Sequence, residues 1–349
     1  MKTKQWVVDK NDAQLASNPQ VHEAAEQLKN GEVVAFPTET VYGLGANACS
    51  DDAIEKIYQA KGRPSDNPLI VHISTMGQLE EIVAEIPVTA QKLMTAFWPG
   101  PLTIIFKKKT GIISEKVTAG LDTVAVRMPS NTVARAIITA TGLPIAAPSA
   151  NQSGKPSPTK AVHVFHDLQG KIAGVVDGGD AGVGVESTVI DCTQEIPTIL
   201  RPGGVSAEEI ERVVDKVKMD VALKDQNEKP ISPGMKYTHY APQAPVYLVD
   251  GDHQWIQSLI DEKRRDGLKV GLLTTTESVD KYQAELVLAC GSKMNLSTVA
   301  ENLFHTLRMF DEQPLDLIFS ETFPEVEIGL AIMNRLKKAA GQRLIQQNK

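Results

Sequence analysis

The chain shows two successive patterns of apolar and polar residues. In the first, which runs to about residue 218, short apolar runs typical of buried strands mix with amphipathic stretches typical of helices. The predicted strands are 32–36, 69–73, 102–106, 124–128, 174–177 and 188–191. The predicted helices are 51–60, 89–97, 131–141, 160–168 and 206–218, and several open on an Asp, Thr, Asn or Ser suited to capping. Because strands and helices follow no regular order, this pattern predicts a mixed, twisted α/β sheet.

The second pattern is regular and begins after residue 245. Predicted strands at 246–249, 269–273, 286–289 and 316–319 alternate with predicted helices at 252–265, 296–310 and 326–340. Such alternation is typical of a small parallel α/β domain with a Rossmann-like order. The stretch between the two patterns is rich in Lys, Asp, Pro and Gly and has the composition of a linker. The predicted organisation is therefore an N-terminal domain over 1–218, a linker over 219–245 and a C-terminal domain over 246–349.

Composition narrows the class of protein. With 42% hydrophobic and 23% charged residues, the 349-residue chain has the balance of a soluble globular protein. Its 3 cysteines lie far apart, which argues against a zinc site or a disulfide framework and suits a reducing cytosol. No apolar run approaches the roughly 20 residues that span a bilayer, and we see no secretory signal. We therefore expect a cytoplasmic protein without a membrane anchor.

Charge bears on nucleic-acid binding. The formal net charge is −7 and the isoelectric point is about 5.6. A general nucleic-acid binder usually carries a basic face that raises the isoelectric point of its domain. The chain is therefore not expected to grip RNA over its whole surface, whereas local basic pockets stay open because net charge does not fix the distribution of charge.

Two polar segments at predicted element ends suggest ligand chemistry. Phe36-Pro-Thr-Glu-Thr-Val-Tyr-Gly-Leu-Gly45 follows a strand directly, and strand exits are where open α/β sheets bind ligands. Lys61 and Arg63 end a helix, and a guanidinium fork with an ammonium group suits a triphosphate. Each segment has a plainer interpretation: the first as a turn, the second as charges that complement the helix C-terminus. His72, in an apolar strand, is by itself more often a core histidine.

Three further segments add candidate ligand contacts. Arg127 lies in the apolar run Val124-Ala-Val-Arg-Met128, so it must either point outward or meet an anion. Ala147-Pro-Ser-Ala-Asn-Gln-Ser-Gly-Lys-Pro-Ser157 combines small hydroxyl and amide residues, which fits close approach to a ligand or a surface loop. The glycine-rich segment 177–188 lacks the strand–helix context of a dinucleotide fingerprint, and Walker spacing is absent from the chain. Ser187 and Arg201 are the candidate contacts there.

Taken together, these segments resemble the threonylcarbamoyl-AMP synthase family, in the long form that joins a YrdC-like catalytic domain to a C-terminal domain. The resemblance covers essentially the whole chain. It is carried by Pro37-Thr-Glu-Thr-Val-Tyr-Gly43, Lys61-Gly-Arg63 with Asn67-Pro68, Pro148-Ser-Ala-Asn151, Glu186-Ser-Thr188, Arg201-Pro-Gly203 and Pro233-Gly-Met-Lys-Tyr-Thr-His-Tyr-Ala-Pro242. It implies a nucleotidyltransferase that converts L-threonine, bicarbonate and ATP into threonylcarbamoyl-AMP and pyrophosphate. This is the first step in threonylcarbamoyl-adenosine modification of tRNA.

The resemblance also implies a division of the site. The residues implied for L-threonine are Thr40, His72, Arg127, Ala147 (through its backbone) and Ser187. Those implied for ATP are Lys61, Arg63, Asn67, Thr123, Ser149, Asn151, Ser157, Arg201 and Tyr240, with Lys61 and Arg63 as the catalytic pair. Catalysis would consist of positioning and charge stabilisation without an enzyme nucleophile. Mg²⁺ would accompany the triphosphate without a protein ligand.

Partners and rivals follow from the same resemblance. The tRNA threonylcarbamoyl-transfer machinery is the expected partner, direct contact with tRNA is left open, and 219–245 is expected to act as a lid that brings Tyr240 to ATP. One rival is a related carbamoyltransferase of hydrogenase maturation, but such proteins carry zinc-finger cysteines and this chain has only 3 isolated ones. The other is a non-catalytic RNA-binding module, which the acidic net charge disfavours.

Overall fold

The structure is a computed structural model that describes residues 2–65, 67–220 and 239–347. The described residues form two compact units. Unit 1 comprises 2–153 without 66, together with 158–182 and 186–220. Unit 2 comprises 239–347 and two short segments from far upstream, 154–157 and 183–185. The domain boundaries expected from composition stay a prediction.

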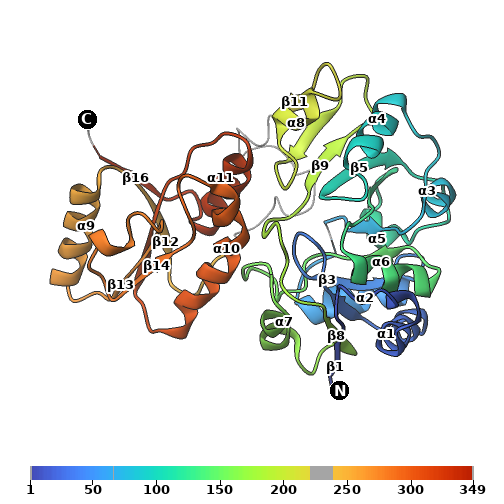
Figure 1. Cartoon of the computed structure of the whole chain (residues 1–349), viewed down its shortest axis with the longest axis horizontal. Coiled ribbons are helices and arrows are strands. Elements are labelled where there is room, and N and C mark those ends of the chain that lie inside the picture. Colours follow the sequence, from blue (N-terminus) through green and yellow to red (C-terminus); the bar gives the residue numbers. More distant parts are fainter. Residues whose placement is uncertain (1, 66, 221–238, 348–349) are drawn as a thin grey trace. The chain divides into compact units, whose positions relative to one another are not determined.

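Unit 1 is built on an 11-stranded sheet with the order β1-β8-β2-β3-β7-β4-β6-β5-β9-β10-β11. Parallel pairs such as β4–β6 and antiparallel pairs such as β5–β6 occur side by side, which confirms the predicted mixed sheet (Figure 1). The strands are β1 (Lys4–Val7), β2 (Val34–Phe36), β3 (Gly43–Asn47), β4 (Ile70–His72), β5 (Leu102–Lys107), β6 (Thr123–Arg127), β7 (Ile145–Ala146), β8 (Gly174–Asp177), β9 (Thr188–Asp191), β10 (Thr198–Arg201) and β11 (Lys218–Met219).

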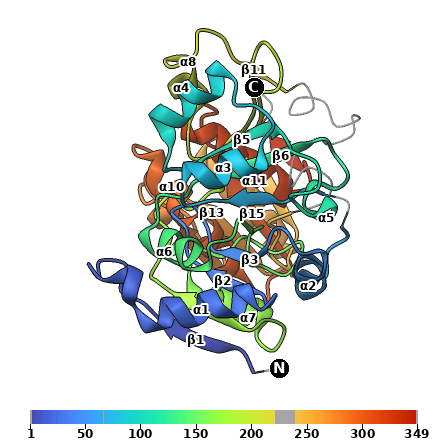
Figure 2. The same cartoon turned by 90° about the vertical axis from the view of Figure 1, so that its right-hand side faces the viewer.

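Helices cover the two faces of this sheet unequally. On one face α1 and α6 pack against each other over a cluster of buried side chains from β2, β7 and β8 (Figure 2). On the other face the remaining helices join the larger core cluster. The helices are α1 (Pro19–Lys29), α2 (Asp51–Lys61), α3 (Met76–Ile82), α4 (Val88–Phe97), α5 (Glu115–Thr118), α6 (Thr132–Thr141), α7 (Ala161–Leu168) and α8 (Ala207–Glu211), with a 3₁₀ turn η1 (Leu15–Ser17).

The ends of the helices follow their local sequence. Side-chain oxygens of Ser50 and Asn131 accept backbone N–H groups at the starts of α2 and α6, as capping residues do. Both helices end at a glycine in the left-handed region, Gly62 at φ 62° and Gly142 at φ 67°. The end of α2 at Gly62 matters for the site because it fixes where Lys61 leaves the helix.

One predicted helix is wrong in its extent. Ser206 and Glu209 exchange hydrogen bonds in a capping box at its start, but α8 stops at Glu211 rather than at 218. Residues 212–215 form turns and bends, and β11 begins at the last residue of the expected helix and pairs in parallel with β10.

Unit 2 contains a parallel five-stranded sheet with the order β14-β13-β15-β12-β16, which confirms the predicted parallel α/β architecture. Helix α9 covers one face and α10 and α11 the other (Figure 1). The elements are β12 (Val246–Asp250), α9 (His253–Arg265), β13 (Val270–Thr274), η3 (Val279–Lys281), β14 (Leu286–Ala289), α10 (Leu296–Met309), η4 (Phe310–Glu312), β15 (Leu317–Glu321), α11 (Ile328–Ala339) and β16 (Leu344–Gln346).

The two upstream segments of unit 2 are held by specific contacts. Arg308 Nη2 of α10 donates to the carbonyl oxygen of Pro156 at 2.5 Å. Gly184, at φ 79°, lies so close to α10 that a Cβ there would come within 2.3 Å of the Ala300 carbonyl oxygen. Most of the predicted lid, 219–245, falls on 221–238, outside the described residues. Within the described part of the chain, no helix combines the length and apolarity needed to cross a bilayer.

Candidate active site on the unit 1 sheet

The functional side chains share one face of the unit 1 sheet. Alternate residues of a strand point to opposite faces, and Val71, Ile104 and Val126 point into the larger core cluster. The opposite face carries a second cluster that consists of strand residues only, Ile70, Ile105, Ala125, Val189 and Leu200. On that face strand alternation also places the side chains of Thr103, His72, Thr123 and Arg127. The register supports this, because His72 lies directly opposite Arg127 across β4 and β6.

A β-bulge brings Arg201 to the same face. Ile199 pairs with Ile190, but the next pair joins Arg201 to Val189, so Leu200 is an extra residue in β10. Residues paired across an antiparallel ladder point to the same face, and a bulge resets the alternation of the strand that carries it. With regular alternation and no bulge, Arg201 would share the core-facing side of Ile199. The bulge therefore accounts for a buried arginine on the ligand side of the sheet.

Arg127 is the centre of a buried polar network. Its side chain is 4% exposed, and its guanidinium meets three different partners. Nε donates to the Gly100 carbonyl oxygen at 3.2 Å and Nη1 donates to Thr40 Oγ1 at 2.8 Å. Nη2 lies 2.6 Å from Glu39 Oε1 in an ion pair. Burial opposes ionisation of Glu39, but the Arg127 charge outweighs it and holds the pKa of that carboxyl below its usual value.

The hydroxyl groups beside Arg127 have defined directions. Thr38 Oγ1 lies 2.6 Å from the Val41 carbonyl oxygen, so the Thr38 proton must be donated there. Thr40 Oγ1 is 2.9 Å from Thr38 Oγ1 and must in turn donate to it. Because a hydroxyl has one proton, Thr40 can only accept from further partners, and it already accepts from Arg127. A ligand can therefore offer Thr40 a hydrogen-bond donor but not an acceptor.

His72 presents an uncharged ring to this network. Burial lowers the pKa of His72 to about 3, and the nearby charge of Arg127 lowers it further while Glu39 acts in the opposite direction. Nδ1 lies 3.2 Å from the Ile70 carbonyl oxygen, which can only accept, so the proton of the neutral ring is on Nδ1. Nε2 is then an acceptor. His72 and Thr40 thus provide acceptors beside the guanidinium donors of Arg127.

Ser187 is held from two sides. Its Oγ lies 2.7 Å from Thr103 Oγ1 of β5, and both residues are buried. Arg201 Nη2 donates to the Ser187 carbonyl oxygen at 3.0 Å and approaches its hydroxyl oxygen at 3.2 Å. Gly203 packs directly against the segment that precedes Ser187, since a Cβ on Gly203 would lie 2.3 Å from the Glu186 carbonyl oxygen. The structure therefore brings together Ser187 and Arg201, which the sequence had assigned to different ligands.

Lys61 organises the loop that follows Ala147. Its Nζ donates to the carbonyl oxygens of Ser149 and Asn151 at 2.5 and 2.8 Å, and lies 3.3 Å from Asn151 Oδ1. Ser149 Oγ lies 2.5 Å from the same amide oxygen. The loop also pairs with Gly43, which belongs to the segment that supplies Thr40. Three of the residues predicted to contact ATP are therefore adjacent.

The other predicted residues occupy separate places. Ala147 is buried beside Ile145 and continues the segment that leads to Ser149. Thr123 begins β6 and Asn67 is buried ahead of β4. Arg63 follows Gly62 at the end of α2, where its N–H donates to the Tyr58 carbonyl oxygen at 3.1 Å. These residues belong to unit 1, and the roles of Ala147 toward threonine and of the other three toward ATP stay predictions.

Ser157 and Tyr240 belong to unit 2. Tyr240 adopts φ 68°, which few residues other than glycine do. Its ring packs against Phe304 with centroids 5.0 Å apart. The next residue, Ala241, donates its N–H to the Gly154 carbonyl oxygen at 3.1 Å. The segments that hold Tyr240 and Ser157 are therefore joined within unit 2, and their predicted contacts with ATP are untested.

Comparison with known proteins identifies the family. A family model described as telomere recombination matches residues 26–203, and a model described as the threonylcarbamoyl-AMP synthase C-terminal domain matches residues 205–341. Threonylcarbamoyl-AMP synthase of Bacillus subtilis is 58% identical over 99% of this chain and 100% of that protein. The chain belongs to the threonylcarbamoyl-AMP synthase family. The enzyme of that name from Pyrococcus abyssi is 47% identical over 93% of this chain and 94% of its own length.

Solved structures agree with the fold of this synthase family member. The crystal structure of P. abyssi Sua5 complexed with L-threonine matches 99% of this chain and 100% of that chain, with a TM-score of 0.92 and 44% identity. A variant of P. abyssi Sua5, with a histidine and the tyrosine after it changed to alanine, gives the same TM-score and identity. It covers 99% of this chain and 98% of its own. The family resemblance inferred from the motifs is therefore confirmed.

Two polar groups of the site were missed by sequence reasoning. Glu39 pairs with Arg127, and Thr103 contacts Ser187. A signal existed for Glu39, because a carboxylate stood between two threonines in the motif assigned to the ligand pocket. Thr103 gave no signal, since one threonine in a strand of apolar residues is ordinary.

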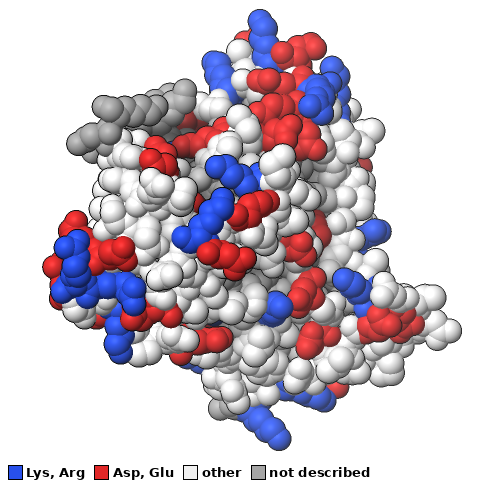
Figure 3. All heavy atoms as spheres, turned by 60° about the vertical axis from the view of Figure 1, so that its left-hand side comes forward, with Lys and Arg blue, Asp and Glu red and all other residues white. Residues whose placement is uncertain are grey.

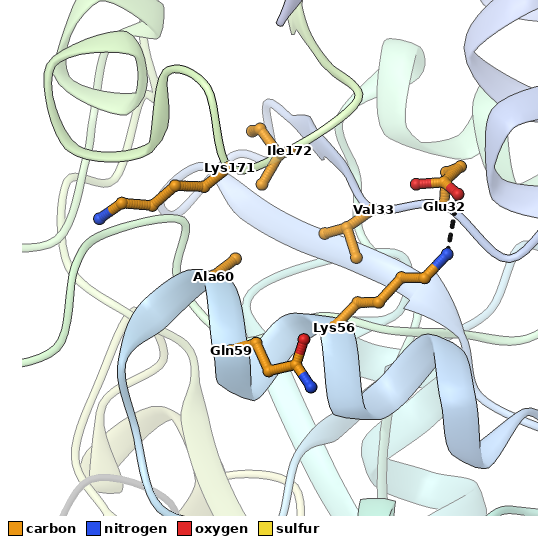
Figure 4. A pocket seen from close by; sticks show the side chains of 7 residues that line it. All are labelled: Glu32, Val33, Lys56, Gln59, Ala60, Lys171 and Ile172. Carbon is orange, nitrogen blue, oxygen red and sulfur yellow. Dashed lines mark hydrogen bonds and ion pairs between the residues drawn. The ribbon is translucent and has the colours of Figure 1, made fainter. Parts of the chain in front are cut away.

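A separate cavity of about 370 Å³ lies away from these residues (Figure 4). It is lined by Glu32, Val33, Lys56, Gln59, Ala60, Lys171 and Ile172. Lys56 is already paired with Glu32 at 2.8 Å. None of the predicted site residues lines this cavity, and we assign it no part in the reaction. On the face drawn in Figure 3, acidic and basic side chains are interspersed.

Proposed function

We propose that the chain forms threonylcarbamoyl-AMP from L-threonine, bicarbonate and ATP. The threonine amine condenses with bicarbonate to give a carbamate and water. A carbamate oxygen then attacks the α-phosphorus of ATP, and pyrophosphate leaves with the electrons of the broken P–O bond. The observation that carries the proposal is that Arg127 lies opposite His72 in the sheet and donates to Thr40 of the β2–β3 loop, in a chain whose family members are named for this product. The L-threonine bound to P. abyssi Sua5 supports the same assignment.

The network around Arg127 suits a zwitterionic amino acid. We propose that the guanidinium binds the ligand's carboxylate, because two N–H groups can hold two carboxylate oxygens in a fixed orientation. Thr40 and the neutral His72 offer acceptors to the ammonium and hydroxyl groups of threonine. An uncharged His72 also avoids a second positive charge beside the substrate amine, which must lose its proton before it can react.

The cluster of Lys61, Ser149 and Asn151 is the proposed place for ATP phosphates. Lys61 provides an ammonium group at the end of α2, and Arg63 is proposed to add a planar fork. We propose that Mg²⁺ arrives on phosphate oxygens and water, the ligands that this ion keeps when it accompanies a nucleotide. Bound in that way, the ion would offset charge on the leaving pyrophosphate.

Further parts of the proposal rest on sequence alone. The tRNA threonylcarbamoyl-transfer machinery would take the product. This chain and that machinery would both be cytoplasmic. A lid over 219–245 would keep water from the reactive adenylate.

Pyrophosphate release by the full-length chain tests the reaction. With ATP present, release is expected to require both threonine and bicarbonate, and omission of either should abolish it. Serine should react more weakly, since one missing methyl group changes discrimination by about 1–3 kcal/mol. Arg63→Ala should impair ATP use and Arg127→Ala threonine use, each through loss of a charge-assisted contact of roughly 1.5–3 kcal/mol. Undiminished release without threonine would refute the assignment.

A further inference from the structure

The best-defined group without an assigned task is the carboxylate of Glu39. It lies in the loop between β2 and β3, one residue before Thr40, and its side chain is 14% exposed. Its Oε1 meets Arg127 Nη2 at 2.6 Å. Among the described residues these two atoms are in ion-pair contact, and neither has a hydrogen-bond partner. Within that part of the chain, the ion pair with Glu39 is therefore the polar contact of the Nη2 side of the guanidinium.

Glu39 is anchored on its other side as well. Its Oε2 accepts from the backbone N–H of Asn131 at 3.4 Å, and Asn131 is the capping residue of α6. A helix N-terminus favours negative charge, so this end of α6 stabilises the carboxylate where it stands. Glu39 is thus held between Arg127 and α6, which makes it a fixed counter-ion rather than a mobile group.

The contacts of Arg127 leave a defined number of donors for a ligand. A guanidinium has five N–H groups; one donates to Gly100 and one to Thr40, and Nη2 faces Glu39 in an ion pair. Counting the ion pair as one N–H, two remain, one on each terminal nitrogen, which is the number that a carboxylate needs for two-point binding. The three partners approach different nitrogens, so together they fix both the position and the plane of the group.

We propose that Glu39 is a positioning residue of the amino-acid pocket, which holds the Arg127 guanidinium so that its two remaining N–H groups select a ligand carboxylate. The proposal rests on the proposed function, because it takes threonine as the ligand. Glu39 acts only through Arg127 and is not itself a catalytic group. Without it, a buried guanidinium would lack its counter-ion and one of its three fixed points.

Near-isosteric replacement separates positioning from folding. In Glu39→Gln one carboxylate oxygen becomes an NH₂ group, which cannot accept a hydrogen bond. The glutamine has a single side-chain oxygen. It can therefore keep the contact with Arg127 or the hydrogen bond from Asn131, but not both. Glu39→Ala removes both contacts and risks destabilising the fold, so the glutamine variant decides the question if the alanine variant does not fold. Glu32→Gln is the matched control, since it breaks the ion pair with Lys56 beside the cavity of Figure 4.

The experiment is calorimetric titration of the full-length proteins with L-threonine and with L-threoninamide, in which a neutral amide replaces the carboxylate. The wild type and Glu32→Gln should prefer threonine by the same factor. In Glu39→Gln that preference should fall roughly tenfold, the effect of about 1.4 kcal/mol, while ATP affinity stays within about twofold of wild type, as expected for an independent site.

The possible outcomes are distinguishable. An unchanged preference in Glu39→Gln would overturn the proposal, since Glu39 would then serve stability alone. Tighter threonine binding in the variant would also overturn it, because Glu39 would then compete with the ligand for Arg127. Failure of the wild type to bind threonine at all would instead refute the proposed function.

Discussion

The neutral state of His72 makes stability depend on pH in a predictable way. A histidine in an unfolded chain titrates near pH 6.5, whereas burial and Arg127 lower the pKa of His72 in the folded protein to about 3. Between these values the unfolded chain binds more protons than the folded one. The contribution of His72 is therefore fully present above pH 6.5 and is lost as the pH falls toward 3. At about 1.36 kcal/mol per pH unit, acidification from pH 7 to 5 should cost about 2 kcal/mol.

The measurement needs a signal from unit 1 alone. The chain has 3 tryptophans, of which Trp6 and Trp98 lie in unit 1 and Trp255 lies in α9 of unit 2. In a Trp255→Phe background, tryptophan fluorescence therefore reports unfolding of unit 1. Urea denaturation at pH 7 and at pH 5 then gives the loss of unfolding free energy on acidification, for the parent and for His72→Gln.

The many carboxylates titrate in both proteins. The difference between the two losses of unfolding free energy therefore gives the contribution of His72. The parent should lose about 2 kcal/mol more than His72→Gln between the two pH values. Equal losses would show that His72 is not held neutral in the folded state. The proposed role of its ring as an acceptor for threonine would then lose its basis.

Three other changes test single contacts of the site. Thr103→Val, which keeps the shape but removes the hydroxyl beside Ser187, should weaken threonine binding by roughly 1 kcal/mol in titrations, whereas Thr103→Ser should stay near wild type. Lys61→Met should abolish pyrophosphate release and leave buried carbonyl oxygens unpaired at about 1–3 kcal/mol each, visible as a lower Tm. Gly203→Ala should displace residues 186–188, because its Cβ would lie 2.3 Å from backbone, and raise KM for threonine; an unchanged KM would contradict this packing.

Much of the fold could be predicted because apolar periodicity dominates it. Strands β8 and β9 begin and end where the apolar runs do, and α2 and α6 follow capping residues visible in the sequence. The helices α1, α3 and α5 and the strands β1, β3, β7, β10, β11 and β16 were missed. In β3 the sequence Gly-Leu-Gly-Ala-Asn has low strand propensity, and its place is set by antiparallel pairing with β2 and β7.

The residues of the site could be predicted from the sequence, but the contacts between them could not. The motif residues Thr40, His72 and Arg127 meet as expected, since strand exits and a charged residue in an apolar strand are visible in the sequence. The direction of Arg201 was not predictable, because it depends on a bulge of one residue in β10. The contact of Arg201 with Ser187 follows from that bulge, which leaves no mark in the pattern of apolar residues.

The alternation that builds the core also builds the site. In β4 and β6 one set of alternate residues fills the large core, and the other set carries Ile70, His72, Ala125 and Arg127. On this second face the apolar residues pack into a small cluster made of strand residues only. A polar residue there must find a hydrogen-bond or ion-pair partner, because burial without one is costly. Arg127 finds partners in two loop residues, Glu39 through an ion pair and Thr40 through a hydrogen bond, and these contacts couple the strands to the β2–β3 loop. The charge of the strand residue thus requires a carboxylate in the loop, and the same requirement keeps the guanidinium in place for a substrate.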